Sequence, residues 1–262
     1  MIPIRLETRY PTHQNAIDLF QDRWLTQLEV LYPELKSGPG RYYLRNDKRP
    51  VQAADHLGFV PGSLHGMKVL ELGPMEGAHT YQLAKLGADS ILAIEANSDA
   101  YLRCLVAKEI LRTPNCRFLL GDFLAFLEQS EERFDLIFCS GVLYHMADPA
   151  RLLAAISKRT DRVFLWTHYF DPLDPRGPTS QPQRVRREGV DITYHEQTYD
   201  LDLQNRTHWG GVAPSSAWME RDEILRICEQ LGFSPKVLDD NRDLPMGHQL
   251  TAVFSRQTGA AA

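Results

Sequence analysis

The stretch Val69-Leu70-Glu71-Leu72-Gly73-Pro74-Met75-Glu76-Gly77-Ala78 joins a short apolar run to two glycines four residues apart, and an amphipathic segment follows it. We interpret this stretch as a β-strand that enters a ligand-binding turn and then a helix. Glycines let the backbone approach a ligand, and the first turn of a helix offers unpaired N–H groups to it. The stretch predicts a site for a nucleoside-bearing cofactor, although glycines between a strand and a helix more often serve only to turn the chain.

Strand and helix patterns alternate from Met67 to Phe170. Apolar runs rich in β-branched residues recur at 67–72, 90–95, 116–120, 134–139 and 161–167. The segments between them carry apolar residues at helical spacing. This alternation is typical of a doubly wound, mostly parallel sheet, whose ligands bind at the carboxyl ends of the strands. The predicted fold class is therefore α/β.

The chain on either side of this core breaks the alternation. Residues 12–32 carry apolar side chains at three- and four-residue steps and predict one amphipathic helix, whereas 36–50 reads as irregular chain. About 45 residues after Phe170 predict a long insertion that could act as a lid. We expect a single domain over 1–262, made of an N-terminal helical cap (1–66), a cofactor-binding core (67–170), a lid insertion (171–218), and a C-terminal helix with closing strands at 235–239 and 248–255 (219–262).

Composition limits the classes of partner. The 262 residues are 43% hydrophobic and 24% charged, which suits an ordinary globular domain, and the net charge of −5 gives no long-range attraction to nucleic acid or anionic lipid. The four cysteines show no metal-binding spacing and predict core thiols in a reducing compartment. The sequence predicts a cytoplasmic protein with a small-molecule partner, no membrane contact and nucleic acid unlikely, and a homodimer is kept as a candidate assembly.

Three acidic residues fall at equivalent places in successive strand–helix units. Glu71 ends the first strand, Glu95 ends the second, and Asp122 follows the third, next to Phe123. Because carboxyl ends of parallel strands face one crevice, we expect these carboxylates to lie together. An acid about 20 residues past the glycine turn can accept hydrogen bonds from ribose hydroxyls.

With these motifs, residues 67–170 resemble the class I S-adenosylmethionine-dependent methyltransferases, whose sheet is Rossmann-like and seven-stranded. The resemblance implies that the glycine turn holds the methionine part of the cofactor, that the second-strand acid binds the ribose, and that the acid after the third strand binds the adenine amino group. The family usually has a glycine where this chain has Met75, so we expect different contacts near the methionine end. The implied cofactor-binding residues are Glu71, Gly73, Pro74, Gly77, Glu95, Ala96, Asp122, Phe123, Ser140 and Tyr144.

The segment Phe138-Cys139-Ser140-Gly141-Val142-Leu143-Tyr144-His145-Met146-Ala147-Asp148-Pro149 carries a second resemblance. It is similar to the segment after the fourth strand in small-molecule methyltransferases, and locally to that of the tRNA wobble-uridine carboxymethyltransferases. In the family this segment lines the sulfonium and methyl-acceptor side. The carboxylated cofactor of the tRNA enzymes is not carried over, because the residues that it needs cannot be placed in this sequence.

Methyl transfer is an in-line displacement, so the protein mainly holds acceptor and methyl group in register and excludes water. A base is needed only for hydroxyl-like acceptors. His145 is the nearest candidate, with ordering of its own turn as the alternative role, and His168 with Tyr169 comes next. His145, His168 and Asp171 have no diagnostic metal-binding spacing, and Ser140 occupies the place where metal-dependent methyltransferases of this fold carry an acid, so no metal is expected.

The insertion supplies the candidate residues for acceptor binding. Its arginines can pair with carboxylate or phosphate, and its rings offer stacking surface, although a charged run such as 184–188 is by default a solvated loop. The candidates are Tyr194, His195, Trp209 and Arg187.

The sequence therefore predicts an S-adenosylmethionine-dependent methyltransferase that acts on an O or N atom of a small molecule. Two alternatives stay open: a tRNA-modifying methyltransferase of the same fold, and a non-catalytic cofactor-binding regulatory protein.

Overall fold

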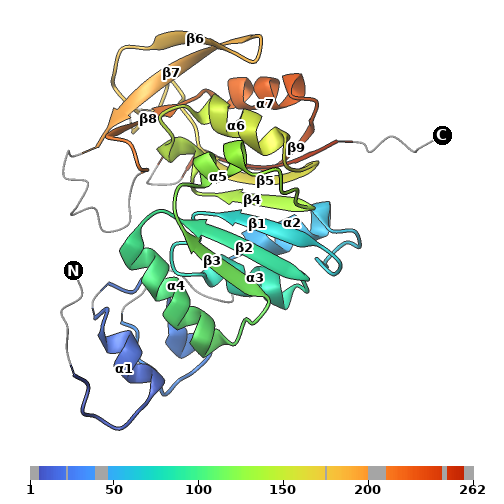
Figure 1. The fold of residues 1–262 in the computed structure, drawn as a ribbon. Coiled ribbons are helices and arrows are strands. Elements are labelled where there is room, and N and C mark those ends of the chain that lie inside the picture. The colour runs from blue at the N-terminus through green and yellow to red at the C-terminus, as the bar shows by residue number, and fades with distance from the viewer. Residues whose placement is uncertain are drawn as a thin grey trace.

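A computed structural model describes residues 6–21, 23–38, 47–174, 176–199, 211–243 and 247–256 of the chain. Helices and strands alternate through its central part (Figure 1). The helices, with 3-10 turns marked η, are α1 His13–Asp18, η1 Leu28–Val30, α2 Arg49–Leu57, α3 Ala78–Lys85, α4 Ser98–Leu111, α5 Phe123–Gln129, η2 Leu143–His145, α6 Pro149–Ser157 and α7 Arg221–Gln230. The strands are β1 Lys68–Leu72, β2 Ser90–Glu95, β3 Cys116–Leu120, β4 Leu136–Ser140, β5 Arg162–His168, β6 Gln183–Arg187, β7 Val190–Thr198, β8 Ser215–Trp218, β9 Ser234–Asn241 and β10 Gln249–Ser255.

The central sheet has seven strands in the order β3-β2-β1-β4-β5-β10-β9. The first five are parallel to one another, and β10 runs antiparallel to both β5 and β9. The predicted α/β fold with a mostly parallel, seven-stranded, Rossmann-like sheet is confirmed. The C-terminal hairpin closes the sheet with β10 inserted beside β5 and with β9 at the edge.

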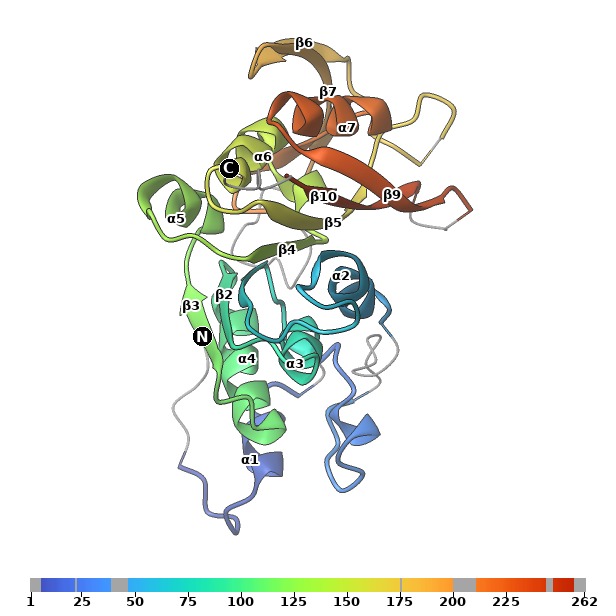
Figure 2. The ribbon, with the colours of Figure 1, turned by 90° about the vertical axis from the view of Figure 1, so that its right-hand side faces the viewer.

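Helices cover both faces of this sheet (Figure 2). Side chains alternate across each strand, so Leu70 packs with α5, α6 and α7, whereas Val69 packs with α2, α3 and α4. The strand order reverses between β1 and β4, which lie side by side at the centre of the sheet. Open α/β sheets bind ligands outside the carboxyl ends of the strands at such a reversal.

The N-terminal part differs from the single helix predicted over 12–32. Helix α1 ends at Asp18, and the backbone N–H groups of Leu25 and Thr26 donate to the carboxylate of Glu76 instead of to helical carbonyls. This competing acceptor comes from the glycine turn, 50 residues further along the chain. A short helix, α2, was also not predicted; it begins at Arg49, inside the stretch that we interpreted as irregular.

We expected the insertion to be a long loop. It instead contains a three-stranded antiparallel sheet, β6-β7-β8. Strands β6 and β7 are joined by Glu188 and Gly189, both with positive φ (47° and 80°). A two-residue connection with positive φ at both positions matches the right-handed twist of the strands. Gly189, at the second position of the connection, is the residue type that such a turn favours.

All four cysteines are buried free thiols, which confirms the prediction of core thiols. Within the described ranges, no helix combines the length and the apolar character needed to cross a membrane.

Candidate functional site

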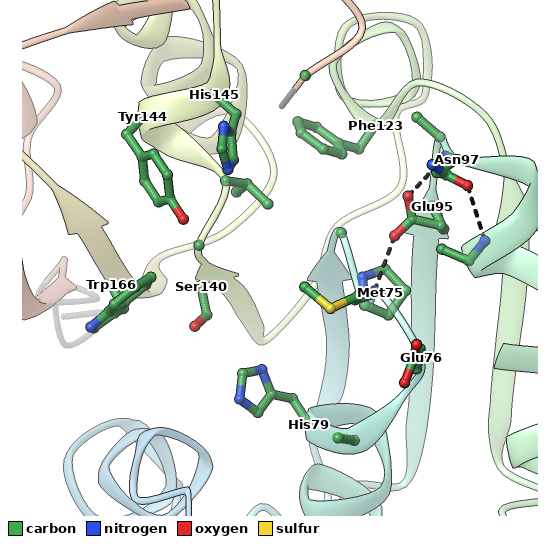
Figure 3. A pocket seen from close by; sticks show the side chains of 18 of the residues that line it. Met75, Glu76, His79, Glu95, Asn97, Phe123, Ser140, Tyr144, His145 and Trp166 are labelled. Atoms are coloured by element: carbon green, nitrogen blue, oxygen red, sulfur yellow. Dashed lines mark hydrogen bonds between the residues drawn. The ribbon is translucent and has the colours of Figure 1, made fainter. Parts of the chain in front are cut away.

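A cavity of about 600 Å³ opens at the carboxyl edge of the parallel strands. Its wall combines residues from the turn after β1, the end of β2, the start of α5, the segment after β4 and the end of β5, together with parts of the N-terminal region and the insertion (Figure 3). We call the part lined by Glu76, Glu95 and Asp122 the acidic end, and the part lined by Tyr144, His145, Trp166 and His168 the aromatic end.

The glycine turn forms the floor of the acidic end. Gly73 has a φ of 64°, and a Cβ there would lie 2.7 Å from Cγ1 of Val142, so a side chain is excluded on both counts. Gly77 precedes α3 in the left-handed region (φ 79°) and does not line the cavity, so its role is to turn the chain into the helix. Met75 also adopts a positive φ, 59°, and its side chain points into the cavity (Figure 3).

The carboxylate of Glu95 is held by backbone donors. It accepts from the N–H of Met75 at 3.0 Å and from the N–H of Asn97 at 2.8 Å. Burial raises the pKa of Glu95, and these N–H groups act against that shift. A carboxylate offers about four lone-pair positions, so it keeps acceptor capacity for a hydroxyl group of a ligand in the cavity. The left-handed backbone at Met75 therefore orients the acid predicted to bind ribose.

Asp122 and Phe123 line the same cavity as Glu95, at the crevice where the sequence placed them. Asp122 caps α5, with Oδ1 accepting from the N–H of Leu124 at 2.8 Å, and both Asp122 and Phe123 line the cavity together with Ala96. One acid, one ring and a helix N-terminus thus meet where a purine with an amino group could bind.

Glu71 does not take the position predicted for it. Its side chain is 1% exposed, accepts a hydrogen bond from the Thr80 hydroxyl under α3 and does not line the cavity. Burial, with the nearby Glu95 carboxylate as a smaller contribution, raises the pKa of Glu71 to about 8, so it is protonated at neutral pH. Side chains alternate along β1, and the one at Glu71 points to the same face as Val69, under α3, where Thr80 lies.

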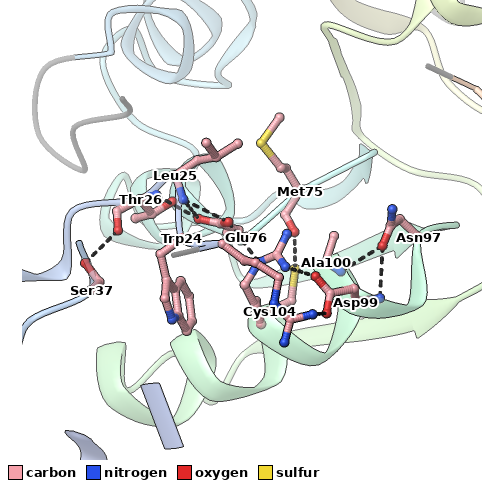
Figure 4. A network of polar contacts seen from close by, with 12 residues as sticks. Trp24, Leu25, Thr26, Ser37, Met75, Glu76, Asn97, Asp99, Ala100 and Cys104 are labelled. Carbon is pink, nitrogen blue, oxygen red and sulfur yellow. Dashed lines mark hydrogen bonds and ion pairs between the residues drawn. The ribbon is translucent and has the colours of Figure 1, made fainter. Parts of the chain in front are cut away.

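A buried polar network fixes the N-terminal region against the acidic end (Figure 4). Glu76, 1% exposed, accepts from Leu25, from Thr26 and from Nε of Arg103 at 2.9 Å. Arg103 is equally buried and also pairs with Asp99. Thr26 and Glu76 both line the cavity, so the N-terminal region forms part of its wall.

Three further polar residues line the cavity between its two ends, and sequence reasoning missed all of them. Arg49 donates through Nη1 to the hydroxyl of Ser140 at 2.9 Å and pairs with Asp47, while its guanidinium lies 4.6 Å from the ring centroid of Trp166. Nε2 of His79 lies 2.9 Å from Asp47. Burial opposes ionisation of Asp47, but these two partners outweigh it and hold its pKa well below the usual range. Nothing local in the sequence links residues 47, 79 and 140.

The aromatic end is a cluster of rings in mutual contact. Tyr144 meets His168 edge to face with 4.7 Å between centroids, and Trp218 stacks on His168 at 5.5 Å. Nδ1 of His168 lies 3.1 Å from the carbonyl oxygen of His248. A carbonyl only accepts, so Nδ1 carries the hydrogen and Nε2 carries the lone pair. Burial lowers the pKa of His168, which keeps the ring neutral.

Most of the residues predicted to bind the acceptor do not line this cavity. The hydroxyl of Tyr194 donates to Asp148 at 2.6 Å, and Arg187 pairs with the same carboxylate, so both stabilise the start of α6. His195 stacks on Phe170. Trp209 lies outside the described residues. The insertion instead reaches the cavity through Gly211 and Val212.

Tyr169, predicted to assist catalysis, points away from the cavity. Its hydroxyl donates to Asp240 on β9 at 2.6 Å. Successive residues of an extended chain point to opposite sides, so His168 faces the cavity and Tyr169 does not. In the part of the chain that the structure describes, no group of three or more His, Cys, Asp or Glu side chains is arranged to hold a metal ion.

Comparisons with known proteins agree with this geometry. Residues 63–175 match the family model described as a methyltransferase domain. A tRNA U34 carboxymethyltransferase of Campylobacter hominis is 32% identical over 111 residues, which is 41% of this chain and 38% of that protein. The corresponding protein of Campylobacter concisus is 28% identical over 56% of this chain and 58% of its own. The chain thus spans less than two thirds of the length of these relatives.

Similarity to a solved structure extends beyond the matched domain. The N-terminal domain of EvdMO1, crystallised with SAH and D-fucose, shares 21% identity at a TM-score of 0.67, over 93% of this chain and 94% of that one. At this identity the similarity shows the fold alone. Residues 63–175 thus match a methyltransferase domain, and the strand order and the position of the cavity agree with the class I S-adenosylmethionine-dependent methyltransferase fold that the sequence resembles.

Proposed function

We propose that this chain transfers a methyl group from S-adenosylmethionine to an O or N atom of a small-molecule acceptor. One observation carries the proposal: the acidic end and the aromatic end are parts of a single cavity of about 600 Å³. Pockets for drug-sized ligands typically measure about 300–1,000 Å³. A cofactor at the acidic end would therefore meet an acceptor at the aromatic end.

The residues of the acidic end fit this cofactor. Glu95 would bind the ribose hydroxyls with its remaining acceptor capacity, and Asp122 with Phe123 would bind the adenine. Arg49 lies toward Ser140, where it would face the carboxylate of the methionine part, because a guanidinium pairs well with a carboxylate. When bound, the cofactor supplies a methyl group on a sulfonium, which is open to in-line displacement.

The aromatic end would position the acceptor and accept its proton. The neutral ring of His168, with its lone pair fixed on Nε2, can take a proton from an acceptor hydroxyl or ammonium. His145 is the second candidate. The rings of Tyr144 and Trp166 offer apolar surface that would exclude water from the reacting atoms.

A second candidate acceptor is a tRNA base. The curated relatives are named tRNA U34 carboxymethyltransferases, so our expectation from net charge that nucleic acid is an unlikely partner has no support from them. Enzymes that modify a base can take it out of the stack into a pocket. The same cavity would then hold one nucleoside in place of a free small molecule.

Transfer of label from methyl-tritiated S-adenosylmethionine tests the proposal and separates the two acceptors. The enzyme is incubated with bulk tRNA in one arm and, in the other, with a panel of phenols, amines and sugars; the panel includes D-fucose because the structural neighbour was crystallised with it. The proposal predicts label in the small-molecule fraction and none in acid-precipitable tRNA. Label in tRNA would overturn the small-molecule acceptor. Cofactor binding with no label in either arm, across cell extracts as well, would favour a regulatory protein.

A further inference from the structure

Asp47 lies just before α2 and joins this helix to α3. Its Oδ1 accepts from the backbone N–H of Arg49 at 3.0 Å and from Nε of the same side chain at 2.9 Å. Its Oδ2 accepts from Nη2 of Arg49 and from Nε2 of His79, which lies 2.9 Å away in the first turn of α3. One carboxylate thus holds a guanidinium and an imidazole that both line the cavity.

We propose that Asp47 is a positioning residue for cofactor binding, which orients the Arg49 guanidinium so that its remaining N–H groups bind the carboxylate of the cofactor's amino-acid end. The inference rests on the proposed function for the identity of this ligand. It adds that a residue of the N-terminal region sets the affinity for one end of the cofactor and acts through a neighbouring side chain.

The hydrogen bonds of Asp47 explain why it acts through Arg49 and not on the ligand directly. A carboxylate offers about four lone-pair positions. Four donors share them here: the backbone N–H, Nε and Nη2 of Arg49, and Nε2 of His79. Asp47 therefore keeps little acceptor capacity for an ammonium or hydroxyl group of a ligand, although it lines the cavity.

The guanidinium of Arg49 is held on three sides and still has donors to offer. Asp47 binds its Nε and Nη2, Oγ of Ser140 accepts from Nη1 at 2.9 Å, and the ring centroid of Trp166 lies 4.6 Å from Cζ. A guanidinium has five N–H groups, and these contacts with described residues use three of them. Two N–H groups thus remain on a residue of the cavity wall, and carboxylates are the partners that guanidinium groups bind best.

Orientation affects affinity because arginine has a long side chain with many rotamers. Ordering such a side chain on binding weakens the complex, and a guanidinium that the protein already holds avoids that cost. Asp47 also places a negative charge near the ligand. The amino-acid end of the cofactor is a zwitterion, so removal of this charge would favour its carboxylate and disfavour its ammonium. These two changes oppose each other, and the loss of orientation then decides the sign of the effect.

A purely structural role for Asp47 would be to start α2. A side chain that accepts from the backbone N–H two residues further along forms an Asx turn, and Asp47 does so at the first residue of the helix. Loss of that turn alone would loosen this wall of the cavity and weaken every ligand to a similar extent. A test must therefore compare ligands with and without the amino-acid end.

Calorimetry of the full chain with two ligands makes this comparison without an acceptor. S-adenosylhomocysteine carries the amino-acid end, whereas 5′-methylthioadenosine has the same nucleoside and sulfur without it. We expect Asp47→Ala to weaken binding of S-adenosylhomocysteine about tenfold and to leave that of 5′-methylthioadenosine within about twofold. Asp47→Asn keeps the size and one acceptor oxygen, so its loss should have the same selectivity and a smaller size, about threefold.

A double variant tests whether Asp47 acts through Arg49. Arg49→Ala should weaken S-adenosylhomocysteine at least as much as Asp47→Ala does. Adding Asp47→Ala to Arg49→Ala should then cause no further loss, because the residue that Asp47 orients is already absent. Asp191→Ala is the matched control: Asp191 also pairs with an arginine, Arg186, but its side chain is 77% exposed on β7, so both dissociation constants should stay native.

Equal losses for the two ligands in Asp47→Ala would overturn the inference, and so would tighter binding of S-adenosylhomocysteine. Losses that add in the double variant would also contradict it, because Asp47 would then act independently of Arg49. Circular dichroism and urea unfolding check that the variants fold, and Asp47→Asn decides the question if Asp47→Ala does not fold.

Label transfer separates this inference from the proposed function. If S-adenosylhomocysteine binds with the expected pattern across the variants but no acceptor is methylated, the proposed function fails and the role of Asp47 stands. If an acceptor is methylated but Asp47→Ala binds S-adenosylhomocysteine as tightly as the native chain, the role of Asp47 fails alone. A native chain that binds neither ligand would overturn both.

Discussion

The two ends of the cavity are assembled from different kinds of chain. The acidic end comes from consecutive units of the parallel sheet, and backbone N–H groups within those units hold its key carboxylate, Glu95. The aromatic end gathers the segment after β4, the end of β5, the start of β10 and the insertion, and its two histidines are oriented by partners from distant segments. We infer that substitutions at the acidic end alter stability and cofactor affinity, whereas those at the aromatic end alter turnover.

The largest effect is expected at Glu76, because its carboxylate joins the acidic end to the folding core. Glu76→Ala would leave the buried Arg103 guanidinium and two backbone N–H groups without this acceptor. Removing one partner of a buried pair typically costs about 3–5 kcal/mol, so the free energy of unfolding should fall by that amount in urea titrations at pH 7.

Glu131→Ala is the control for this substitution, since Glu131 is exposed and should change stability by less than about 0.5 kcal/mol. A loss below about 1 kcal/mol in Glu76→Ala would mean that the N-terminal region is not held through this carboxylate.

Glu71 should make stability depend on pH. Below its usual pKa of 4.5 the carboxyl is protonated in the folded and the unfolded chain, and between 4.5 and about 8 only the folded chain keeps the proton. Stability should therefore fall by about 1.4 kcal/mol per pH unit in that range, or about 3 kcal/mol between pH 5.5 and 8, and level off above 8.

Glu71→Gln removes the titrating group and retains an oxygen that can accept from Thr80. The difference between native and variant isolates Glu71 from other titrating groups, and it should grow with pH in favour of the variant. A difference that is constant from pH 5.5 to 8 would contradict a protonated Glu71.

His168 tests the aromatic end. His168→Asn keeps a side-chain N–H near the carbonyl of His248 but removes Nε2, the atom that would take the proton. General-base catalysis contributes about 10²–10⁴-fold, so kcat should fall at least about 100-fold with an acceptor that must lose a proton. The dissociation constant of the cofactor should stay within twofold in calorimetry.

His65→Asn is the control for His168, because the side chain of His65 is 88% exposed. Full turnover in His168→Asn would show that His168 is not a required base and that positioning, or His145, accounts for the rate. Loss of cofactor affinity in the same variant would contradict the inference that the aromatic end affects turnover and not cofactor binding.

Glu95 tests the acidic end in the opposite way. Glu95→Gln replaces the charged acceptor that would bind ribose hydroxyls, and a hydrogen bond to a charged group contributes about 1.5–3 kcal/mol. The dissociation constant should therefore rise about 10- to 100-fold in calorimetry, while kcat at saturating cofactor stays near the native value. Glu131→Gln serves as the control, and an unchanged affinity in Glu95→Gln would mean that the ribose lies elsewhere.

The range of the contacts, local or long-range, explains which features could be predicted from the sequence. The glycine turn and the cap at Asp122 act through neighbours a few residues away, and Glu95 lies one strand–helix unit beyond the turn that it binds, so their spacing and the family resemblance located this part of the acidic end. The mostly parallel, seven-stranded sheet was predicted from the alternation and the family resemblance, whereas its strand order comes from the structure. Glu71 was misplaced because equivalent positions at strand ends do not guarantee that the side chains share a face.

Long-range partners account for the other errors. The predicted N-terminal helix is interrupted because the Glu76 carboxylate, 50 residues away, binds its backbone N–H groups. Arg49 reaches Ser140 across 91 residues, and Tyr194 of the insertion turns toward Asp148 instead of the cavity. None of these pairings leaves a local pattern, so they could be found only from the structure.

Met75 offers the finest test of the acidic end, through a comparison of two small substitutions. Its backbone has a φ of 59°, a conformation that costs a residue with a Cβ about 1 kcal/mol or more and costs glycine little. That conformation directs its N–H to Glu95. Met75→Ala and Met75→Gly both remove the side chain from the cavity, but only the glycine variant is free of the strain. In urea unfolding, Met75→Gly should therefore be more stable than Met75→Ala by about 0.5–1 kcal/mol, the reverse of the usual order for these residues. If Met75→Ala is the more stable variant, the left-handed turn is not what holds the Glu95 carboxylate.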